Sequence, residues 1–192
     1  MKRGAFFRNL TLMTVVGLVA VGCIARGDTM PNDDIVQYEQ ALVQFQGDPA
    51  GIEIGVKRFR ESFVDLASDN VGELMASLYA EEMFFNDTLH TFRRREDLVE
   101  YMVKTGASLS ESKVEVSQVM SDGADVFVRW IMTFRTQALG QDINSESIGM
   151  THLRFNADGE VVLHQDFWDS GHALYAHLPI VGFAVRRARN RL

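Results

Sequence analysis

Four long segments between Lys113 and Asp169 alternate apolar and polar residues, and this alternation limits the chain to folds that contain an extended sheet. The segments are Lys113–Met120, Asp125–Thr136, Ser145–Phe155 and Val161–Asp169. Turn sequences join them, most clearly Ser121-Asp122-Gly123 and Asn156-Ala157-Asp158-Gly159. The sequence therefore predicts an antiparallel meander of four strands.

Helical spacing dominates the chain before this meander. A first helix carries an apolar stripe and ends before Gly47-Asp48-Pro49, and a second helix carries another stripe. The two stripes are Ile35, Tyr38, Leu42 and Phe45, then Val56, Phe59, Phe63 and Leu66. Asn70 and Glu73 resemble a capping box that opens a short third helix with Leu74, Leu78 and Tyr79.

A short strand, Met83–Asp87, follows the third helix, and Arg95-Glu96-Asp97 opens a further helix that includes Leu98, Tyr101 and Met102. His90 and Arg93–Arg95 are expected to form a solvated loop between them. Helices that pack on one side of an antiparallel sheet make an α+β domain. We expect the sheet to be curved and to wrap around the helices.

The first residues resemble an export signal. Lys2, Arg3 and Arg8 precede an uncharged apolar run, Leu10–Gly22, which is shorter than the roughly 20 residues of a membrane-spanning helix. The run ends at Cys23, the single cysteine of the chain, in a pattern that resembles a bacterial lipobox. Cleavage of an ordinary signal, for example after Ala25, and an uncleaved anchor are the alternatives.

These features divide the chain into a signal peptide (1–22), a tether with an N-terminal helix (23–50), a main domain (51–176) and a basic tail (177–192). We expect an exported bacterial protein of the periplasm or cell envelope, which a lipid on Cys23 anchors to a membrane. The net charge is −7, and removal of residues 1–22, which carry three positive charges and no negative ones, changes it to −10. Such an acidic surface is unsuited to nucleic acid.

The tail has the opposite charge. It contains Arg186, Arg187, Arg189 and Arg191 beside a short apolar run. Cations stabilise the C-terminal end of a docked helix, which is the simpler interpretation. A helix that lies on anionic lipid is the alternative.

The last strand of the meander has unexpected polar residues. In the sequence VVLHQDFWDSG, which starts at Val161, the face with His164, Asp166 and Trp168 includes two titratable groups where a core would hold aliphatic ones. A curved sheet under helices can leave a cone-shaped pocket, and small-molecule sites are apolar cavities with a few inward polar groups. The candidate polar groups are Asp87, His152, His164 and Asp166, and the candidate wall includes Trp130, Met132, Met150, Tyr101, and Phe167 or Trp168.

The order of the elements and two sequence segments resemble the nuclear transport factor 2-like superfamily and, within it, the SnoaL-like group. The segments are LYAEEMFFNDTLHTFRRREDLVEYM and HQDFWD, and the resemblance extends over about Ile52–Tyr175. It implies a cone-shaped α+β barrel. The superfamily includes steroid isomerases, polyketide cyclases, epoxide hydrolases and proteins without catalysis, so the fold alone does not assign a function.

The catalytic residues known from the superfamily are only partly present in this sequence. The steroid isomerases have an Asp-Pro pair after the first strand, where this chain has Asp87-Thr88. Limonene epoxide hydrolase uses an Asp-Arg-Asp set; Asp166 and Arg129 match two of its members, but Ile131 stands at the third position. The SnoaL-type cyclases use a histidine and an aspartate, a role that suits Asp166 with His152 or His164.

We therefore expect a small hydrophobic molecule in the cavity. If the protein is an enzyme, cofactor-free acid–base chemistry is expected, with Asp166 as main base or orienting group, a histidine partner, and Asp87 as second carboxylate. The expected ligand contacts are Trp130, Arg129, Trp168, Met150 and Tyr101. The alternatives are a non-catalytic binding protein, an interaction lipoprotein with a filled cone, and an epoxide hydrolase or isomerase-like enzyme. A homodimer is possible, and no spacing typical of a metal site occurs.

Overall fold

The computed structural model describes residues 33–138, 141–178 and 181–191. The chain divides into two units after Val36, and the unit Gln37–Leu192 contains the sheet and the helices described below, except for the first turn of the first helix, 33–36. The predicted signal peptide, Cys23 and the start of the tether lie outside the described residues. Among the helices that are described, none combines the length and the apolar character needed to cross a bilayer.

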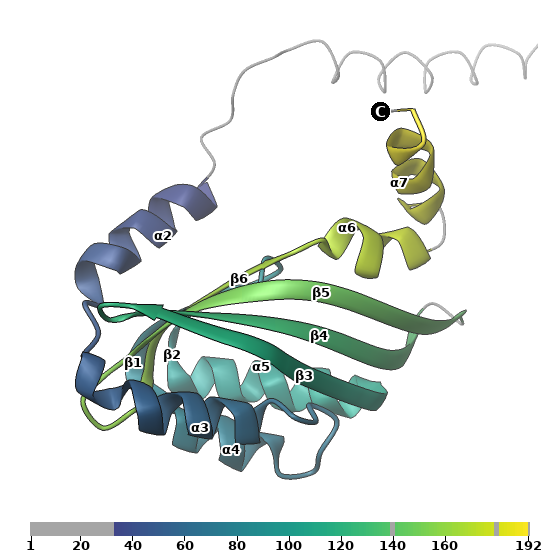
Figure 1. Ribbon diagram of the computed structural model, residues 1–192. Helices are drawn as coiled ribbons and strands as arrows, with labels where there is room; N and C mark the ends of the chain where they lie inside the picture. Colours follow the sequence, from purple (N-terminus) through teal and green to yellow (C-terminus); the bar gives the residue numbers. More distant parts are fainter. Residues whose placement is uncertain (1–32, 139–140, 179–180, 192) are drawn as a thin grey trace, which may run out of the picture. The chain divides into compact units, whose positions relative to one another are not determined.

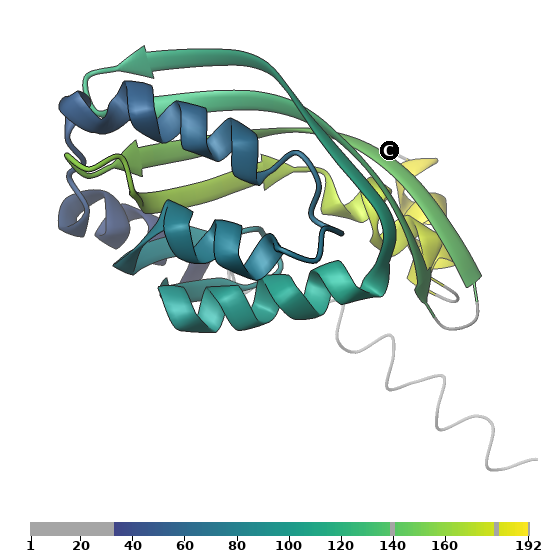
Figure 2. The same ribbon diagram turned by 90° about the horizontal axis from the view of Figure 1, so that it is seen from below.

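The main unit is built on a six-stranded sheet with the order β2-β1-β6-β5-β4-β3. The strands are β1 (Tyr79–Asn86), β2 (Thr91–Arg94), β3 (Leu109–Asp122), β4 (Asp125–Ala138), β5 (Gln141–Phe155) and β6 (Val161–Trp168). The antiparallel meander β3-β4-β5-β6 confirms the prediction, whereas β1 pairs with β6 in parallel. Figure 2 shows the long strands curving over the helices. The predicted mixed α+β fold with a curved sheet is confirmed.

Three helices pack on the concave face of the sheet (Figures 1 and 2). They are α3 (Ile52–Ser62), α4 (Val71–Leu78) and α5 (Arg95–Ser108), and a 3₁₀ turn, η1 (Pro49–Gly51), precedes them. The apolar stripe of α3 places Phe59 and Phe63 in the main core with Met75 and Leu98. This core closes the narrow part of the space between helices and sheet.

Further helical elements lie outside this layer. The helix α2 (Asp33–Gln44) contributes Ala41 to a small second core with Phe84 of β1 and Leu163 of β6. After β6 the chain forms α6 (Ser170–Ala173), η2 (Tyr175–His177) and α7 (Val181–Arg189). Phe84 and Leu163 belong to the sheet face opposite the main core, so both faces of β1 and β6 are covered.

Two local predictions are wrong. The side chain of Asn70 does not cap α4, because it accepts a hydrogen bond from the Ser68 hydroxyl instead. The segment with Arg93 and Arg94 forms the edge strand β2, not a loop. The pairing of Phe92 with Phe85 of β1 accounts for this strand.

The contact between α3 and β5 depends on a glycine. A Cβ atom at Gly55 would lie 2.2 Å from Cδ1 of Phe155, whose ring is fully buried. Gly72 on α4 differs, since its nearest obstacle is a methyl group of the exposed Val103. The helix α3 can therefore approach the sheet this closely only with glycine at position 55.

We predict that Gly55→Ala destabilises the domain by about 1–2 kcal/mol. A contact of 2.2 Å places the overpacking cost in the upper part of the usual range, at about 2–3 kcal/mol, so about 1–2 kcal/mol remains after the helix-propensity gain of about 1 kcal/mol. The free energy of unfolding in urea measures the effect. The control is Gly72→Ala, which should be neutral or stabilising by up to about 1 kcal/mol, because Val103 can rotate away and the propensity gain remains. Equal stability of the Gly55 variant and the wild type would show that the helix and the sheet are not in close contact.

Candidate functional site

A cavity of about 230 Å³ lies between the concave face of the sheet and the helices. Its wall is mainly apolar and aromatic. The apolar lining residues are Phe59, Phe63, Leu66, Phe85, Leu89, Met102, Leu109, Val114, Trp130, Met132, Phe134, Trp168 and Leu174. The volume is below the roughly 300–1,000 Å³ of sites for drug-sized ligands, which favours a smaller molecule.

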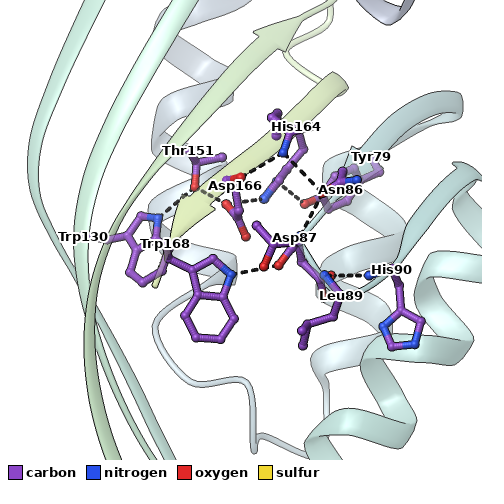
Figure 3. A network of polar contacts seen from close by, with 12 residues as sticks. Tyr79, Asn86, Asp87, Leu89, His90, Trp130, Thr151, His164, Asp166 and Trp168 are labelled. Atoms are coloured by element: carbon purple, nitrogen blue, oxygen red, sulfur yellow. Dashed lines mark hydrogen bonds and ion pairs between the residues drawn. The ribbon is translucent and has the colours of Figure 1, made fainter. Parts of the chain in front are cut away.

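Polar groups on β4, β5, β6 and α5, and in the turn after β1, also line the cavity, and Thr105, Ser108 and Thr136 are among them. Asp87 follows β1, Tyr101 belongs to α5, Thr151 to β5, and His164 and Asp166 to β6. Figure 3 shows Asp166 and Asp87 close to each other, with Trp168 beside them. The parallel pairing of β1 with β6 brings the ends of these two strands together, because Asn86 lies opposite Gln165.

Asp166 is held through one of its two carboxylate oxygens. The Thr151 hydroxyl lies 2.5 Å from Oδ1, and Nε2 of His164 lies 2.9 Å from the same atom. Thr151 donates the hydrogen bond to Asp166, because a carboxylate oxygen can only accept, and the Thr151 oxygen in turn accepts a hydrogen bond from the Trp130 indole at 2.8 Å. Within the described residues, no hydrogen bond reaches Oδ2, so this oxygen remains available to a ligand.

His164 links Asp166 to a buried tyrosine. Its Nδ1 lies 2.8 Å from the Tyr79 hydroxyl, and both side chains are almost completely buried. Burial raises the pKa of Tyr79 well above its ordinary value, and the nearby Asp166 and Asp87 raise it further. The phenol therefore keeps its proton and donates a hydrogen bond to Nδ1. This assigns the imidazole N–H to Nε2, which faces Asp166.

Asp87 has a different environment, because both of its oxygens are occupied. Oδ1 accepts hydrogen bonds from the backbone N–H groups of Leu89 and His90, and Oδ2 accepts one from Tyr101 at 2.5 Å. Burial, followed by the charge and hydrogen bond of Asp87, raises the pKa of Tyr101. Asp87 therefore shapes the turn and orients the Tyr101 phenol, and it is less available than Asp166 as a base.

The turn after Asp87 explains the missing proline. Thr88 has a φ of 72°, whereas the ring of proline holds φ near −65°. A proline at this position is incompatible with the turn that binds Asp87. The departure from the Asp-Pro pattern of the steroid isomerases thus reflects a different local backbone.

Six of the nine residues predicted for catalysis or ligand contact line the cavity: Asp166, Asp87, His164, Trp130, Trp168 and Tyr101. The other three, His152, Met150 and Arg129, do not line it. On β4 the inward position belongs to Trp130, so the neighbouring Arg129 is exposed on the other face. On β5 the inward position belongs to Thr151, so its neighbours Met150 and His152 also face outward.

The predicted placement of these three residues in the cavity is wrong, and the reason is a one-residue register shift. At the start of the hairpin Phe155 pairs with Val161, whereas Arg154 pairs with Leu163. Without this shift, residue 150 would lie opposite Asp166. With it, Thr151 lies opposite Asp166. The Asp-Arg-Asp pattern is therefore not assembled, because Arg129 cannot reach the cavity.

Sequence reasoning missed Thr151 and Tyr79. Thr151 could have been found only with the register shift, since it stands between two other candidates, the wall residue Met150 and the polar residue His152. Tyr79 was expected at the end of a helix, but it is the first residue of β1 and is fully buried. Among the described residues, no group of histidine, cysteine and carboxylate side chains is arranged to hold a metal ion.

Comparison with known families agrees with this architecture. A model of the SnoaL-like domain matches residues 56–164, more than half of the chain. The chain belongs to the SnoaL-like domain family. No curated protein matches the SnoaL-like chain significantly.

Solved structures with the same fold are distant in sequence. An LEH-like epoxide hydrolase from M. tuberculosis is 13% identical, with a TM-score of 0.53, over 72% of this chain and 98% of that one. An NTF2-like protein of unknown function from Exiguobacterium sp. 255-15 is 18% identical, with a TM-score of 0.50, over 60% and 98% of the two chains. TsrD from Streptomyces laurentii is 13% identical, with a TM-score of 0.53, over 69% and 97%. These similarities establish the fold.

His152 takes part in a second polar network on the outer face. Its Nδ1 lies 2.7 Å from the Tyr38 hydroxyl, and its Nε2 lies 2.7 Å from Asp125. Arg154 contacts the same carboxylate at 2.5 Å and donates to the carbonyl oxygens of Leu42 and Phe45. The network ties the end of α2 to the sheet.

Burial lowers the pKa of His152, although Asp125 opposes the shift. Burial also opposes ionisation of Asp125, but hydrogen bonds from Arg154 and His152 outweigh it and lower the pKa of Asp125. Below the ordinary histidine pKa of about 6.5, the unfolded chain therefore binds a proton that folded His152 resists. This contribution to stability is present above that pH and is lost as the pH falls.

We predict that the free energy of unfolding decreases between about pH 7 and about pH 5, and that His152→Gln reduces the decrease. Urea unfolding at both pH values measures it. The exposed His177 provides the matched control, since His177→Gln should keep the full dependence. An unchanged pH dependence in the His152 variant would exclude this histidine as the titrating group.

Proposed function

We propose that the SnoaL-like domain binds a small, largely apolar molecule in the cavity and performs cofactor-free acid–base chemistry on it. The observation that carries the proposal is the one-sided fixation of Asp166. Its Oδ1 accepts hydrogen bonds from Thr151 and His164, while Oδ2 has no partner among the described residues. A carboxylate fixed in this way has one oxygen oriented for a ligand proton.

The surrounding groups suit a base that is shielded from water. Asp166 is 16% exposed, and the apolar wall limits competing hydration. In the proposed reaction Oδ2 removes a proton from an acidic C–H or O–H group of the ligand and returns it at another position, so no redox partner is needed. The cavity is not filled by Trp130 and Trp168, which supports ligand binding over a purely structural role.

Non-catalytic binding is the second candidate, and the size of the cavity favours it equally. In that case Oδ2 accepts a hydrogen bond from the ligand without removing the proton. Epoxide hydrolysis receives less support, because Arg129 lies on the other face of the sheet. Both remaining candidates predict the same ligand class, an apolar body with one hydrogen-bond donor.

We predict that 2-naphthol binds the cavity more tightly than 2-methoxynaphthalene, which has no donor, by about tenfold or more, the range expected for a hydrogen bond to a charged acceptor. Asp166→Asn should remove this preference. Thr151 and His164 both donate to Oδ1, so the introduced amide must place its oxygen there and its NH₂ group towards the ligand. Fluorescence titration or calorimetry measures the two affinities.

The matched control is Asp142→Asn, which removes an exposed carboxylate that does not line the cavity. Equal affinity of the wild type for both probes would contradict the role of Asp166. The same proteins separate catalysis from binding when they are incubated with 2-tetralone in D₂O. An enzyme should accelerate deuterium exchange at the carbon next to the carbonyl, and Asp166→Asn should reduce the rate by about 100-fold or more.

We further propose that the mature protein is lipidated on Cys23 and held at a membrane of the cell envelope. The sequence around Cys23 and the apolar run before it support this proposal. Two covalently attached chains give stable anchoring, whereas one gives only marginal binding. The acidic body would then remain in solution beside the membrane, without nucleic acid as a partner; a homodimer is also compatible with this arrangement.

We predict that cells expressing the full chain incorporate labelled palmitate into this protein and that Cys23→Ser abolishes the label. Cys23 is the only cysteine, so no other thiol can replace it. Membrane fractionation should show the variant released from the membrane or retained as an uncleaved precursor. Unchanged labelling in the variant would contradict lipidation at Cys23.

A further inference from the structure

The C-terminal helix α7 differs in charge from the rest of the protein. Residues 178–192 contain four arginines and no acidic residue. Residues 23–177 contain twelve lysines and arginines and 26 acidic residues, which gives a net charge of −14. The positive charge that the tail carries is therefore concentrated in one short segment beside a strongly acidic body.

Side chains of α7 form a shallow hollow on its surface. It is lined by Phe183, Arg186 and Arg187 of the helix and by Asn190 and Arg191 of the turn that follows it. The three helical residues are three to four positions apart and share one face, and the hydrogen bond from the backbone N–H of Asn190 to the Arg186 carbonyl continues the helical path into the turn. Phe183 is 64% exposed. Within the described residues, Arg187 and Arg191 take part in no ion pair, so their charges remain available to an anion.

An adjacent side of α7 is attached to the domain, and Arg186 lies at the border between this side and the hollow. Gly182 is buried, and a Cβ atom at this position would lie 2.3 Å from the carbonyl oxygen of Ala176 in η2. Arg186 donates a hydrogen bond to the same carbonyl, and Arg189 contacts the Asp169 carboxylate at 2.7 Å. The helix is thus fixed on η2, and these contacts leave Phe183, Arg187 and Arg191 exposed.

We propose that α7 docks on the surface of an anionic phospholipid bilayer. Arg187 and Arg191 bind lipid phosphates, and Phe183 inserts between the head groups. Exposed aromatic residues next to arginines are typical of helices that lie in the membrane interface. A free phosphate would satisfy the arginines but would leave Phe183 in water, so the bilayer is the better match to the complete surface.

This docking surface is connected to the cavity wall. Leu174, between α6 and η2, lines the cavity, and α7 packs on η2. Asp169, the partner of Arg189, follows Trp168, which also lines the cavity. A bilayer bound to α7 would therefore lie near the elements that bound the cavity, although the docking itself does not depend on the function proposed for the cavity.

Vesicle co-sedimentation tests the proposal. The full chain is used with Cys23→Ser, so that no lipid is attached, and all variants share the same N-terminal region. The vesicles contain phosphatidylcholine alone or together with phosphatidylglycerol. We expect Arg187→Gln with Arg191→Gln to lower the partitioning into the anionic vesicles by about tenfold or more, and Phe183→Ala to lower it further in the same background.

The matched control is Lys104→Gln with Lys113→Gln, which removes the same charge from exposed positions on α5 and β3. This control should retain the binding of the parent protein. All variants should fold, because the altered side chains are exposed, and their unfolding curves test this. The proposal would be overturned if the arginine and lysine double variants lost vesicle binding equally, or if the arginine double variant lost none. This outcome does not depend on whether the cavity binds the naphthol probe.

Discussion

The one-residue register shift at the start of the β5–β6 hairpin determines the chemistry of both faces of the sheet. Because adjacent residues of a strand face opposite sides, this shift decides which members of β5 share a face with Asp166. It places Thr151 opposite Asp166 and His152 opposite Gln165. The hairpin thereby has one histidine on each face, and only His164 belongs to the cavity.

Each of these histidines forms a chain with a tyrosine and an aspartate, and the surroundings make the two chains different. Tyr79–His164–Asp166 ends at a carboxylate oxygen that faces an apolar cavity. Tyr38–His152–Asp125 ends at a carboxylate that Arg154 also binds, which neutralises its charge. Similar residue types therefore leave a carboxylate oxygen open to the cavity in one triad and attach α2 to the sheet in the other. A histidine–aspartate pair is therefore insufficient evidence for a functional site. Whether the second carboxylate oxygen of the aspartate is left without a partner is more informative.

The order of elements, the meander and the α+β class could be predicted from sequence, because long alternating segments and strong turns are local signals. The parallel pairing of β1 with β6 could not, since it joins segments far apart in the chain. Asp87, His164 and Asp166 were identified because the residue types are unusual for their positions. Arg129, Met150 and His152 were misplaced because strand parity depends on a shift that no residue of the hairpin reveals by itself. Tyr79 was missed because its burial depends on contacts with β6, which is far from it in the sequence.

The distribution of charge restricts how this domain can approach a membrane. A body with a net charge of −14 is repelled by an anionic surface within roughly 8–10 Å at physiological salt, so only a segment of opposite charge can make close contact. The four arginines of the tail meet this condition, and the attachment of α7 to η2 limits the orientations that the domain can adopt while the helix is bound. A lipid anchor alone would hold the chain near the bilayer without fixing its orientation, because the tether has no regular apolar pattern. The attachment of the cationic helix to η2 would therefore determine which part of the domain, including the wall near Leu174, faces the lipid.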